Sequence, residues 1–355
     1  MRSVLVLFLL VSAATALTGA DRYAILHDRA DGGSYPKLLV LRDNQAGIEA
    51  AVAPAAGGEL CSLRVRHNAE WIETIARARD YSETSGWRGK APLLWPATGR
   101  NIPKGADRGG QNFTYEWKGR MLPMPLHGFV RDMEWTEESH SFGELGAELI
   151  LSAGDTPQTR AMYPFGFRLL TAYRLADGVL IIAYTVRADA ENGEPMPFSI
   201  GNHITFRAPL LEGTKPEEML METPSSVEYI KADPGIPTGE TKPCSLAKPV
   251  KLAALTHGTA ISLGGYQGEV FMRYADPQGL AIRLSHRAAS LPEPPVILFN
   301  LWGDPAAGMW SPEPWVGLQN SLNLRQGLVW LPPGESWEWS PKCADLQRHR
   351  SAGLG

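Results

Sequence analysis

The side chains in this sequence that could perform chemistry are polar residues set singly among aromatic residues and prolines. His203 lies inside the apolar stretch MPFSIGNHITF, residues 196–206, and Glu313 stands between two prolines in SPEPWVGLQNSLN, residues 311–323. An imidazole and a carboxylate can together take and give protons, which is acid–base chemistry that needs no cofactor. Taken alone, each has a simpler interpretation: a histidine bonded to backbone in the core, and a carboxylate in an exposed loop.

Three further polar residues occur in segments of the same kind. Arg100 and Asn101 end APLLWPATGRN, residues 91–101, and His127 lies in LPMPLHGFVRDMEW, residues 122–135. Taken singly, His127 is compatible with a turn that satisfies its imidazole, and Arg100 with a surface arginine. The ordered set of segments is more specific than any one of them.

Several common enzyme classes are excluded by motifs that the sequence lacks. The glycine-rich GADRGGQNF has neither the lysine nor the spacing of a phosphate-binding loop, and no HExxH, Gly-x-Ser-x-Gly or zinc-ligand spacing occurs. A formal net charge of -4 gives no electrostatic reason to expect nucleic acid as a partner. The sequence therefore predicts an acid–base site without metal or organic cofactor.

The elements that must position these residues are strands. Apolar alternation on both sides of a turn signal predicts pairs of strands, and helical periodicity is scarce, with residues 70–80 open to either interpretation. The predicted pairs span residues 38–54, 167–188, 269–286 and 327–340. We expect an all-β fold, a large antiparallel β-sandwich. No linker divides the chain, the Pro-rich residues 234–249 are expected to form a surface loop, and residues 21–355 are expected to form a single domain.

The first 20 residues have the pattern of a cleavable secretory signal peptide. Arg2 precedes an apolar run over residues 4–11, and small residues suited to signal peptidase follow. The run is too short to span a membrane, and no cysteine follows it that would carry a lipid anchor. We therefore expect cleavage near Leu17 or Asp21 and a secreted or periplasmic protein without a membrane anchor.

Three cysteines remain after such a cleavage, and an odd number leaves at least one thiol unpaired. Cys61 is expected to be buried in a strand, where cysteine behaves as a small apolar residue. Cys244 and Cys343 are expected to lie in loops, where they could form a disulfide with each other.

The ordered segments resemble the aldose 1-epimerase (galactose mutarotase-like) family over most of the chain. GGELCSLRV resembles the family's opening Gly-x-x-x-x-Ser-Leu segment, and GWRGKAPLLWPATGRN its Pro-x-Leu-Phe-Pro-x-x-Gly-Arg segment, with Trp95 where phenylalanine is usual. MPLHGFVRDMEW resembles the His-Gly-Phe-Ala-Arg segment, and YPFGFRLLTAYRL the Tyr-Pro-Phe-x-Phe strand. The resemblance implies a large β-sandwich called a supersandwich, and an isomerase that interconverts the anomers of a free sugar.

The resemblance also assigns roles. FSIGNHITF matches the segment that carries the family's general acid, which makes His203 the acid, with Gly201 letting the backbone bend beside the ligand. EPWVG matches the segment of the general base, which makes Glu313 the base. Both oxygens that exchange protons in mutarotation are bonded to one carbon, so a base and an acid must converge on a small volume.

Arg100 and His127 match the residues that hold sugar hydroxyls, and Asn101 is expected to join them. The family usually has an acidic substrate-binding residue before a later strand. Here Thr256 and His257 take that place, so His257 is the candidate. A second departure is Ile204-Thr205 after the acid histidine, where Pro-Tyr is usual; together these leave the identity of the sugar open.

Other functions compete with mutarotation. One alternative is a related sugar-phosphate epimerase, although export of the protein would make phosphosugars poor substrates. A β-sandwich that binds carbohydrate without turnover would need neither His203 nor Glu313 to face a common space. Glycoside hydrolysis ranks last, because hydrolases normally use two carboxylates and only one is evident.

Overall fold

The computed structural model describes residues 22–27, 37–77, 91–105, 113–232, 235–255 and 260–345. The expected signal peptide, residues 1–20, and the candidate His257 lie outside these described residues. Within them, the chain is mostly strand, and the two α-helices, α2 (Pro157–Met162) and α3 (Ser321–Leu324), are short. No helix of this part is long and apolar enough to cross a membrane.

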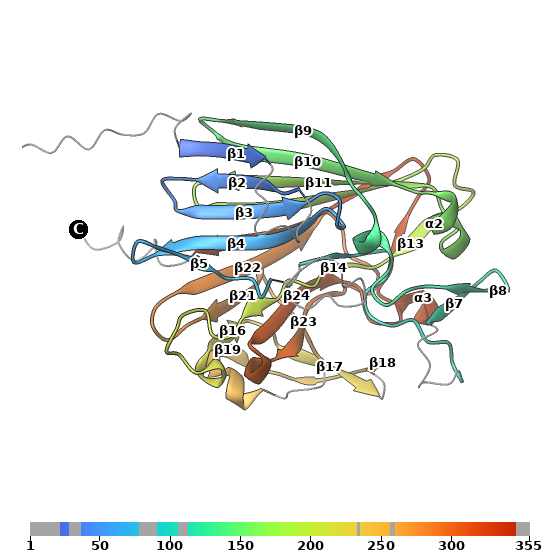
Figure 1. Cartoon of the computed structure of the whole chain (residues 1–355). Helices are drawn as coiled ribbons and strands as arrows, with labels where there is room; N and C mark the ends of the chain where they lie inside the picture. Colours follow the sequence, from blue (N-terminus) through green and yellow to red (C-terminus); the bar gives the residue numbers. More distant parts are fainter. Residues whose placement is uncertain are drawn as a thin grey trace, which may run out of the picture.

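Three antiparallel sheets dominate the described part of the chain (Figure 1). The five-stranded sheet has the order β1 (Tyr23–His27), β2 (Leu39–Asp43), β3 (Ile48–Ala53), β4 (Glu59–His67), β5 (Glu70–Glu73). The nine-stranded sheet has the order β19 (Leu246–Lys251), β16 (Leu220–Thr223), β21 (Val270–Ala275), β22 (Ala281–Ala288), β26 (Ser336–Asp345), β12 (Val179–Ala188), β11 (Phe167–Ala176), β10 (Gly146–Gly154), β9 (Thr136–Gly143).

The eight-stranded sheet carries the candidate site. Its order is β18 (Ile236–Pro243), β17 (Val227–Ala232), β20 (Ile261–Gly264), β23 (Ile297–Asp304), β24 (Met309–Val316), β14 (Ile200–Asn202), β6 (Leu93–Leu94), with β15 (Phe206–Arg207) also pairing with β24. Two small pairs complete the description: β13 (Met196–Phe198) with β25 (Val329–Leu331), and β7 (Thr114–Trp117) with β8 (Arg120–Pro123).

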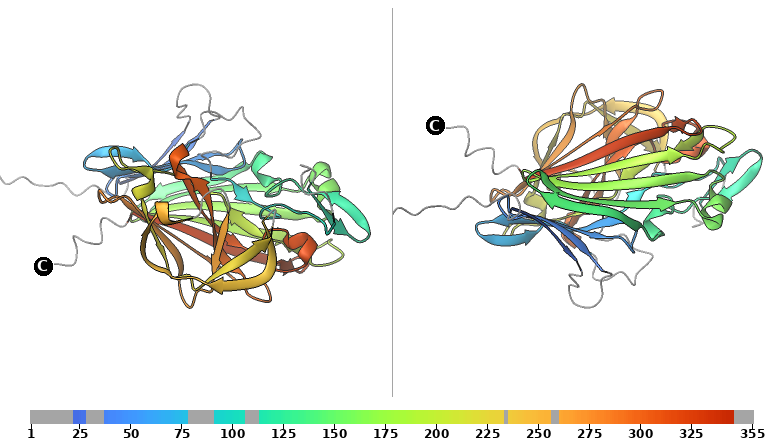
Figure 2. Two further views of the ribbon diagram at one scale, coloured as in Figure 1. Left: turned by 90° about the horizontal axis from the view of Figure 1, so that it is seen from below. Right: turned by 90° about the horizontal axis from the view of Figure 1, so that it is seen from above.

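The nine-stranded sheet is the layer that the other two share. The five-stranded sheet packs against its β9–β11 end, and the eight-stranded sheet packs against β21 and β22 (Figure 2). In β11 and β12 buried and more exposed residues alternate, because successive side chains of a strand point to opposite faces. The buried faces join one large apolar core that extends from Tyr23 to Cys343. This confirms the prediction of a large antiparallel β-sandwich.

Two predictions about loops are wrong. The Pro-rich residues 234–249 contain all of β18 and part of β19 rather than one surface loop. Both strands lie at the edge of a sheet, where proline is tolerated because its missing N–H would face away from the ladder. Cys343 is not in a loop either: it is buried in β26, and no disulfide joins the three cysteines in the described structure. Cys61 is buried in β4, as predicted.

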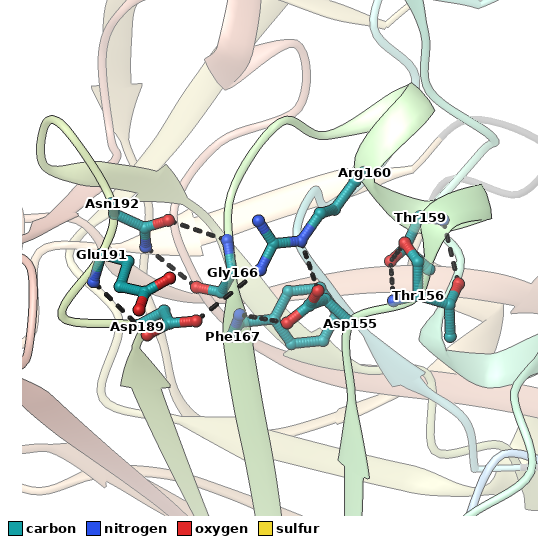
Figure 3. Close-up of polar contacts among 9 residues, drawn as sticks. All are labelled: Asp155, Thr156, Thr159, Arg160, Gly166, Phe167, Asp189, Glu191 and Asn192. Carbon is teal, nitrogen blue, oxygen red and sulfur yellow. Dashed lines mark hydrogen bonds and ion pairs between the residues drawn. The ribbon is translucent and has the colours of Figure 1, made fainter.

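A polar cluster fixes the connection between β10 and β11 (Figure 3). Asn192 forms two hydrogen bonds with the backbone of Gly166, donating to its carbonyl at 2.9 Å and accepting from its N–H at 2.8 Å. Arg160 donates to Asp155 and lies 3.6 Å from Asp189. Glycine at position 166 leaves room for the Arg160 and Asp189 side chains, since a Cβ there would lie 2.6 Å from an atom of each and both would have to shift.

The same connection carries Tyr163, which contacts two segments that lead to candidate site residues. The Tyr163 hydroxyl donates to the carbonyl oxygen of Pro197 in β13 at 2.7 Å. Its ring also packs edge-on against Trp95, 5.4 Å between centroids. The loop thereby supports both the segment that leads to His203 and the segment that leads to Arg100.

Candidate active site

The strand that carries His203 is interrupted. β13 ends at Phe198, β14 covers Ile200–Asn202, and the chain leaves the sheet until β15 begins at Phe206. Gly201 pairs with Trp315 of β24, and a Cβ at position 201 would lie 2.4 Å from the indole Cδ1 atom. Its φ is not in the positive range, so Gly201 makes room for the indole rather than bending the chain as expected.

His203 is held in the gap between β14 and β15. Its backbone N–H donates to the carbonyl of Pro92 at 3.0 Å, and its ring Nδ1 lies 3.4 Å from the hydroxyl of Thr205. Thr205 is in turn hydrogen-bonded to Ser311 of β24 at 2.7 Å. The Ile204-Thr205 departure from the family pattern therefore places a hydroxyl against the imidazole.

Glu313 lies in the middle of β24 and not in an exposed loop. It is paired with Asn300 of β23, and only 1% of the residue is exposed. Oε1 accepts a hydrogen bond from Asn300 Nδ2 at 3.1 Å, and Oε2 accepts one from Trp315 Nε1 at 3.1 Å. Because alternate residues of a strand share a face, Trp315 and Ser311 lie on the same face as Glu313.

The acid and base candidates converge. His203 Nε2 lies 3.6 Å from Glu313 Oε1, and both side chains are almost completely buried. The His127 ring lies edge-on to His203, with 5.5 Å between centroids, and 5.9 Å from Trp315. Among the described residues, no three His, Cys, Asp or Glu side chains gather in an arrangement suited to a metal ion.

His127 has an unusual backbone for a histidine. Its φ is +65°, in the left-handed region where residues other than glycine are uncommon and often functional. The Gly99 N–H donates to Nδ1 at 3.0 Å, so the proton of the neutral ring is on Nε2. Burial lowers the pKa of His127 well below its usual value, and the positive charges of His203, Arg131 and Arg100 add to this effect. His127 is therefore a neutral hydrogen-bond donor.

Arg100 and Asn101 differ in their surroundings. Arg100 is exposed, and its guanidinium lies 6.0 Å from the ring centroid of Phe113. Asn101 is completely buried, and neither polar atom of its side chain has a hydrogen-bond partner in the described structure. The structure thus brings His203, Glu313 and His127 together and leaves Arg100 exposed, at the end of the segment bonded to His127. The side chain of Asn101 forms no hydrogen bond with the pair.

Comparison with known proteins decides the family. A sequence model described as aldose 1-epimerase matches residues 38–262. The chain belongs to the aldose 1-epimerase family. This is a family of isomerases, and the resemblance seen in the sequence is confirmed.

Individual relatives of the family are more distant. The chromosomal LacX protein of Lactococcus lactis is 27% identical over 169 residues, which is 47% of this chain and 50% of LacX. A candidate glucose-6-phosphate 1-epimerase of Escherichia coli K12 is 30% identical over 90 residues, 24% of this chain and 31% of the relative. The alignments span half or less of the length of these curated relatives.

Solved structures of the family share the fold. A galactose mutarotase-like protein from Clostridium acetobutylicum superposes with a TM-score of 0.72 at 18% identity, covering 91% of this chain and 98% of that one. Galactose 1-epimerase from Lactobacillus acidophilus gives a TM-score of 0.65 at 14% identity, with the same coverage of both chains. At these identities the likeness establishes the galactose mutarotase-like sandwich.

Burial governs the charges of the acid–base pair in this family member. It raises the pKa of Glu313 to about 8, although the hydrogen bond from Asn300, the charge of Lys231 and the hydrogen bond from Trp315 act in the opposite direction. It lowers the pKa of His203 to about 4, and the charge of Arg131 adds to this while a backbone hydrogen bond opposes it. Between these two values the pair holds one proton, and in the free protein this proton resides on Glu313.

Sequence reasoning missed the residues that hold Glu313. Asn300 and Trp315 donate to its two oxygens, and Lys231 and Ser262 contact Asn300. The one available signal was the i, i+2 spacing of Glu313 and Trp315, which places both on one face once the segment is recognised as a strand. Asn300 comes from β23, the strand before β24, whereas Lys231 and Ser262 come from β17 and β20, which are more distant in sequence.

Proposed function

We propose that the protein is an aldose 1-epimerase that interconverts the α and β anomers of a free aldose by acid–base ring opening. The observation that carries the proposal is the approach of His203 Nε2 to Glu313 Oε1, 3.6 Å apart in a buried site. The two oxygens that exchange protons in a cyclic sugar are bonded to one carbon, and two groups this close can reach both. Sugar binding alone would need neither group, which favours turnover over a non-catalytic binding module.

The reaction starts from the form of the pair in which its one proton has moved from Glu313 to His203, across the 3.6 Å between them. The Glu313 carboxylate takes the proton of the anomeric hydroxyl, the C1–O1 bond becomes a carbonyl, and the C1–O5 bond breaks. His203 gives its proton to O5, so the open-chain aldehyde is neutral and the pair still holds one proton. Rotation about C1–C2 and the reverse transfers close the ring on the other face. Each such positioned group contributes about 10²–10⁴-fold in rate.

The remaining candidates hold the sugar. The Nε2–H of neutral His127 donates to a hydroxyl, and the Arg100 guanidinium fixes hydroxyls without competing for the proton because it stays protonated. Asn101, whose buried amide has no partner in the described structure, and His257 complete the proposed binding set. The substrate is a neutral aldose, and export through residues 1–20 places the enzyme in the periplasm or outside the cell.

Polarimetry tests this proposal directly. Freshly dissolved α-anomers of several aldoses are followed with the purified mature protein, with Glu144→Gln as a control because Glu144 is exposed and far along the chain from the site. Faster relaxation of at least one sugar with both proteins supports the proposal. Acceleration of sugar 6-phosphates alone would favour the phosphate epimerase, and no acceleration of any sugar would overturn mutarotation.

A further inference from the structure

Lys231 is a partly buried lysine that the acid–base chemistry described above does not use. It lies at the end of β17, on the hairpin that β17 forms with β18 (Figure 1). The register of that hairpin shifts between Tyr229, which pairs with Thr241, and Lys231, which pairs with Pro237. Tyr229, two residues earlier and on the same face, packs in the apolar cluster that contains Trp315.

The Lys231 ammonium is bonded to the residue that holds Glu313. Its Nζ donates to the carbonyl of Ala260 at 2.9 Å and to Asn300 Oδ1 at 3.0 Å. Ser262 Oγ also donates to Asn300 Oδ1, at 2.9 Å. Two donors on one side of the amide fix it with Oδ1 toward Lys231, so that Nδ2 must face Glu313.

This orientation matters for the state of Glu313. An amide with its N–H toward the carboxyl group stabilises the carboxylate, whereas the reversed amide would favour the protonated acid. The ammonium charge acts in the same direction, since it lowers the pKa of Glu313. Burial lowers the pKa of Lys231 to about 8, and the negative charge of Glu313 opposes this effect. Removing an ammonium from water is costly unless it is paired, and a partly buried side chain that only filled space would not need a charge.

We propose that Lys231 is a positioning residue: acting through the Asn300 amide, its ammonium stabilises the carboxylate form of Glu313, the form that accepts the anomeric proton. The proposal rests on the proposed function for its catalytic meaning. The other charged or titratable groups near this chain of contacts are Glu228 on β17, His203, and, beside His203, His127 and Arg131. All of them are retained in the variants below.

The first test needs no activity, so it separates this inference from the proposed function. Glutamate carboxyl carbons are labelled with ¹³C, the Glu313 signal is assigned by its loss in Glu313→Gln, and its titration is followed in the free protein. Lys231→Met should move the midpoint to higher pH by about one unit, because an opposite charge nearby is removed. Lys231→Arg should restore it, and Lys242→Met, an exposed lysine on the same hairpin, should leave it unchanged.

The second test uses the reaction. With Lys231→Met, the upper limb of the pH profile of kcat/KM, which belongs to Glu313, should move to higher pH. For each unit of displacement kcat near neutral pH should fall about tenfold, because the form with Glu313 as carboxylate and the proton on His203 becomes tenfold rarer. KM should stay within a few-fold, since Lys231 is not expected to touch the sugar. Ser262→Ala removes a neutral donor from the same Asn300 oxygen and should displace the upper limb less than Lys231→Met does.

An unchanged Glu313 midpoint in Lys231→Met overturns the proposal, as does a fall in activity that is equal at every pH. Equal displacements in Lys231→Met and Ser262→Ala would also contradict it, because the charge would then have no part. If Lys231→Met does not fold, Lys231→Gln takes its place, since it keeps a donor for Ala260 and lacks the charge.

Discussion

Replacing Glu313 by glutamine separates the basicity of this residue from its size. Both carboxylate oxygens accept an N–H donor at 3.1 Å, from Asn300 and from Trp315. Glutamine has one oxygen, so its NH₂ group must face one of these two donors. A buried donor left without an acceptor costs about 1–3 kcal/mol in the free energy of unfolding. The loss of the base should lower kcat by about 10²–10⁴-fold.

The two effects are measured separately. Urea unfolding gives the stability change, and polarimetry at saturating sugar gives kcat, with Glu144→Gln as the matched control that should alter neither. Sugar binding, followed by calorimetry, should persist in Glu313→Gln, because the proposed hydroxyl contacts of Arg100 and His127 are intact. Near-normal kcat in a folded Glu313→Gln variant would refute the reasoning, and the base would have to be sought elsewhere.

Three further predictions concern the pair, its binding partners and export. The profile of kcat/KM against pH should be a bell with limbs near pH 4 and pH 8. Below the lower value the pair gains a second proton, and above the higher value it loses its last one. Activity that is flat from pH 3 to pH 10 would contradict this prediction. Arg100→Ala and His127→Ala should mainly raise KM, whereas a collapse of kcat at unchanged KM would show that they do more than hold hydroxyls. Mass spectrometry of the protein from its own host should find an N-terminus near Leu17 or Asp21, and an intact Met1 in the cytosol would exclude export.

The predictions that succeeded from sequence rest on local signals. The strand pairs at residues 38–54, 167–188 and 269–286 are hairpins in the structure, since alternation and the turn between the strands lie within one short stretch. The stretch at 327–340 also forms two strands, but they do not pair with each other: β25 pairs with β13, and β26 with β12 and β22. The chain does turn between β25 and β26, but each strand pairs with a strand of a different sheet.

Prolines misled the predictions where tertiary context took precedence. Glu313, between Pro312 and Pro314, was compatible with a loop, yet β24 pairs in register with β23 on one side. The family resemblance supplied the assignment of His203 and Glu313, and the structure places them 3.6 Å apart. Lys231 and Asn300 could not be predicted, because their contact depends on the order β17, β20, β23, β24 in the sheet, which no local pattern encodes.

The central claim is that His203 and Glu313 act as one acid–base unit on a sugar. Its most direct test is polarimetry of wild type, Glu313→Gln, His203→Asn and the double variant, at saturating concentrations of the aldose that the wild type accelerates best. Residues that act as a unit give non-additive losses, so the double variant should be about as slow as the slower single variant. If instead the two losses multiply in the double variant, His203 and Glu313 act independently and the account is contradicted.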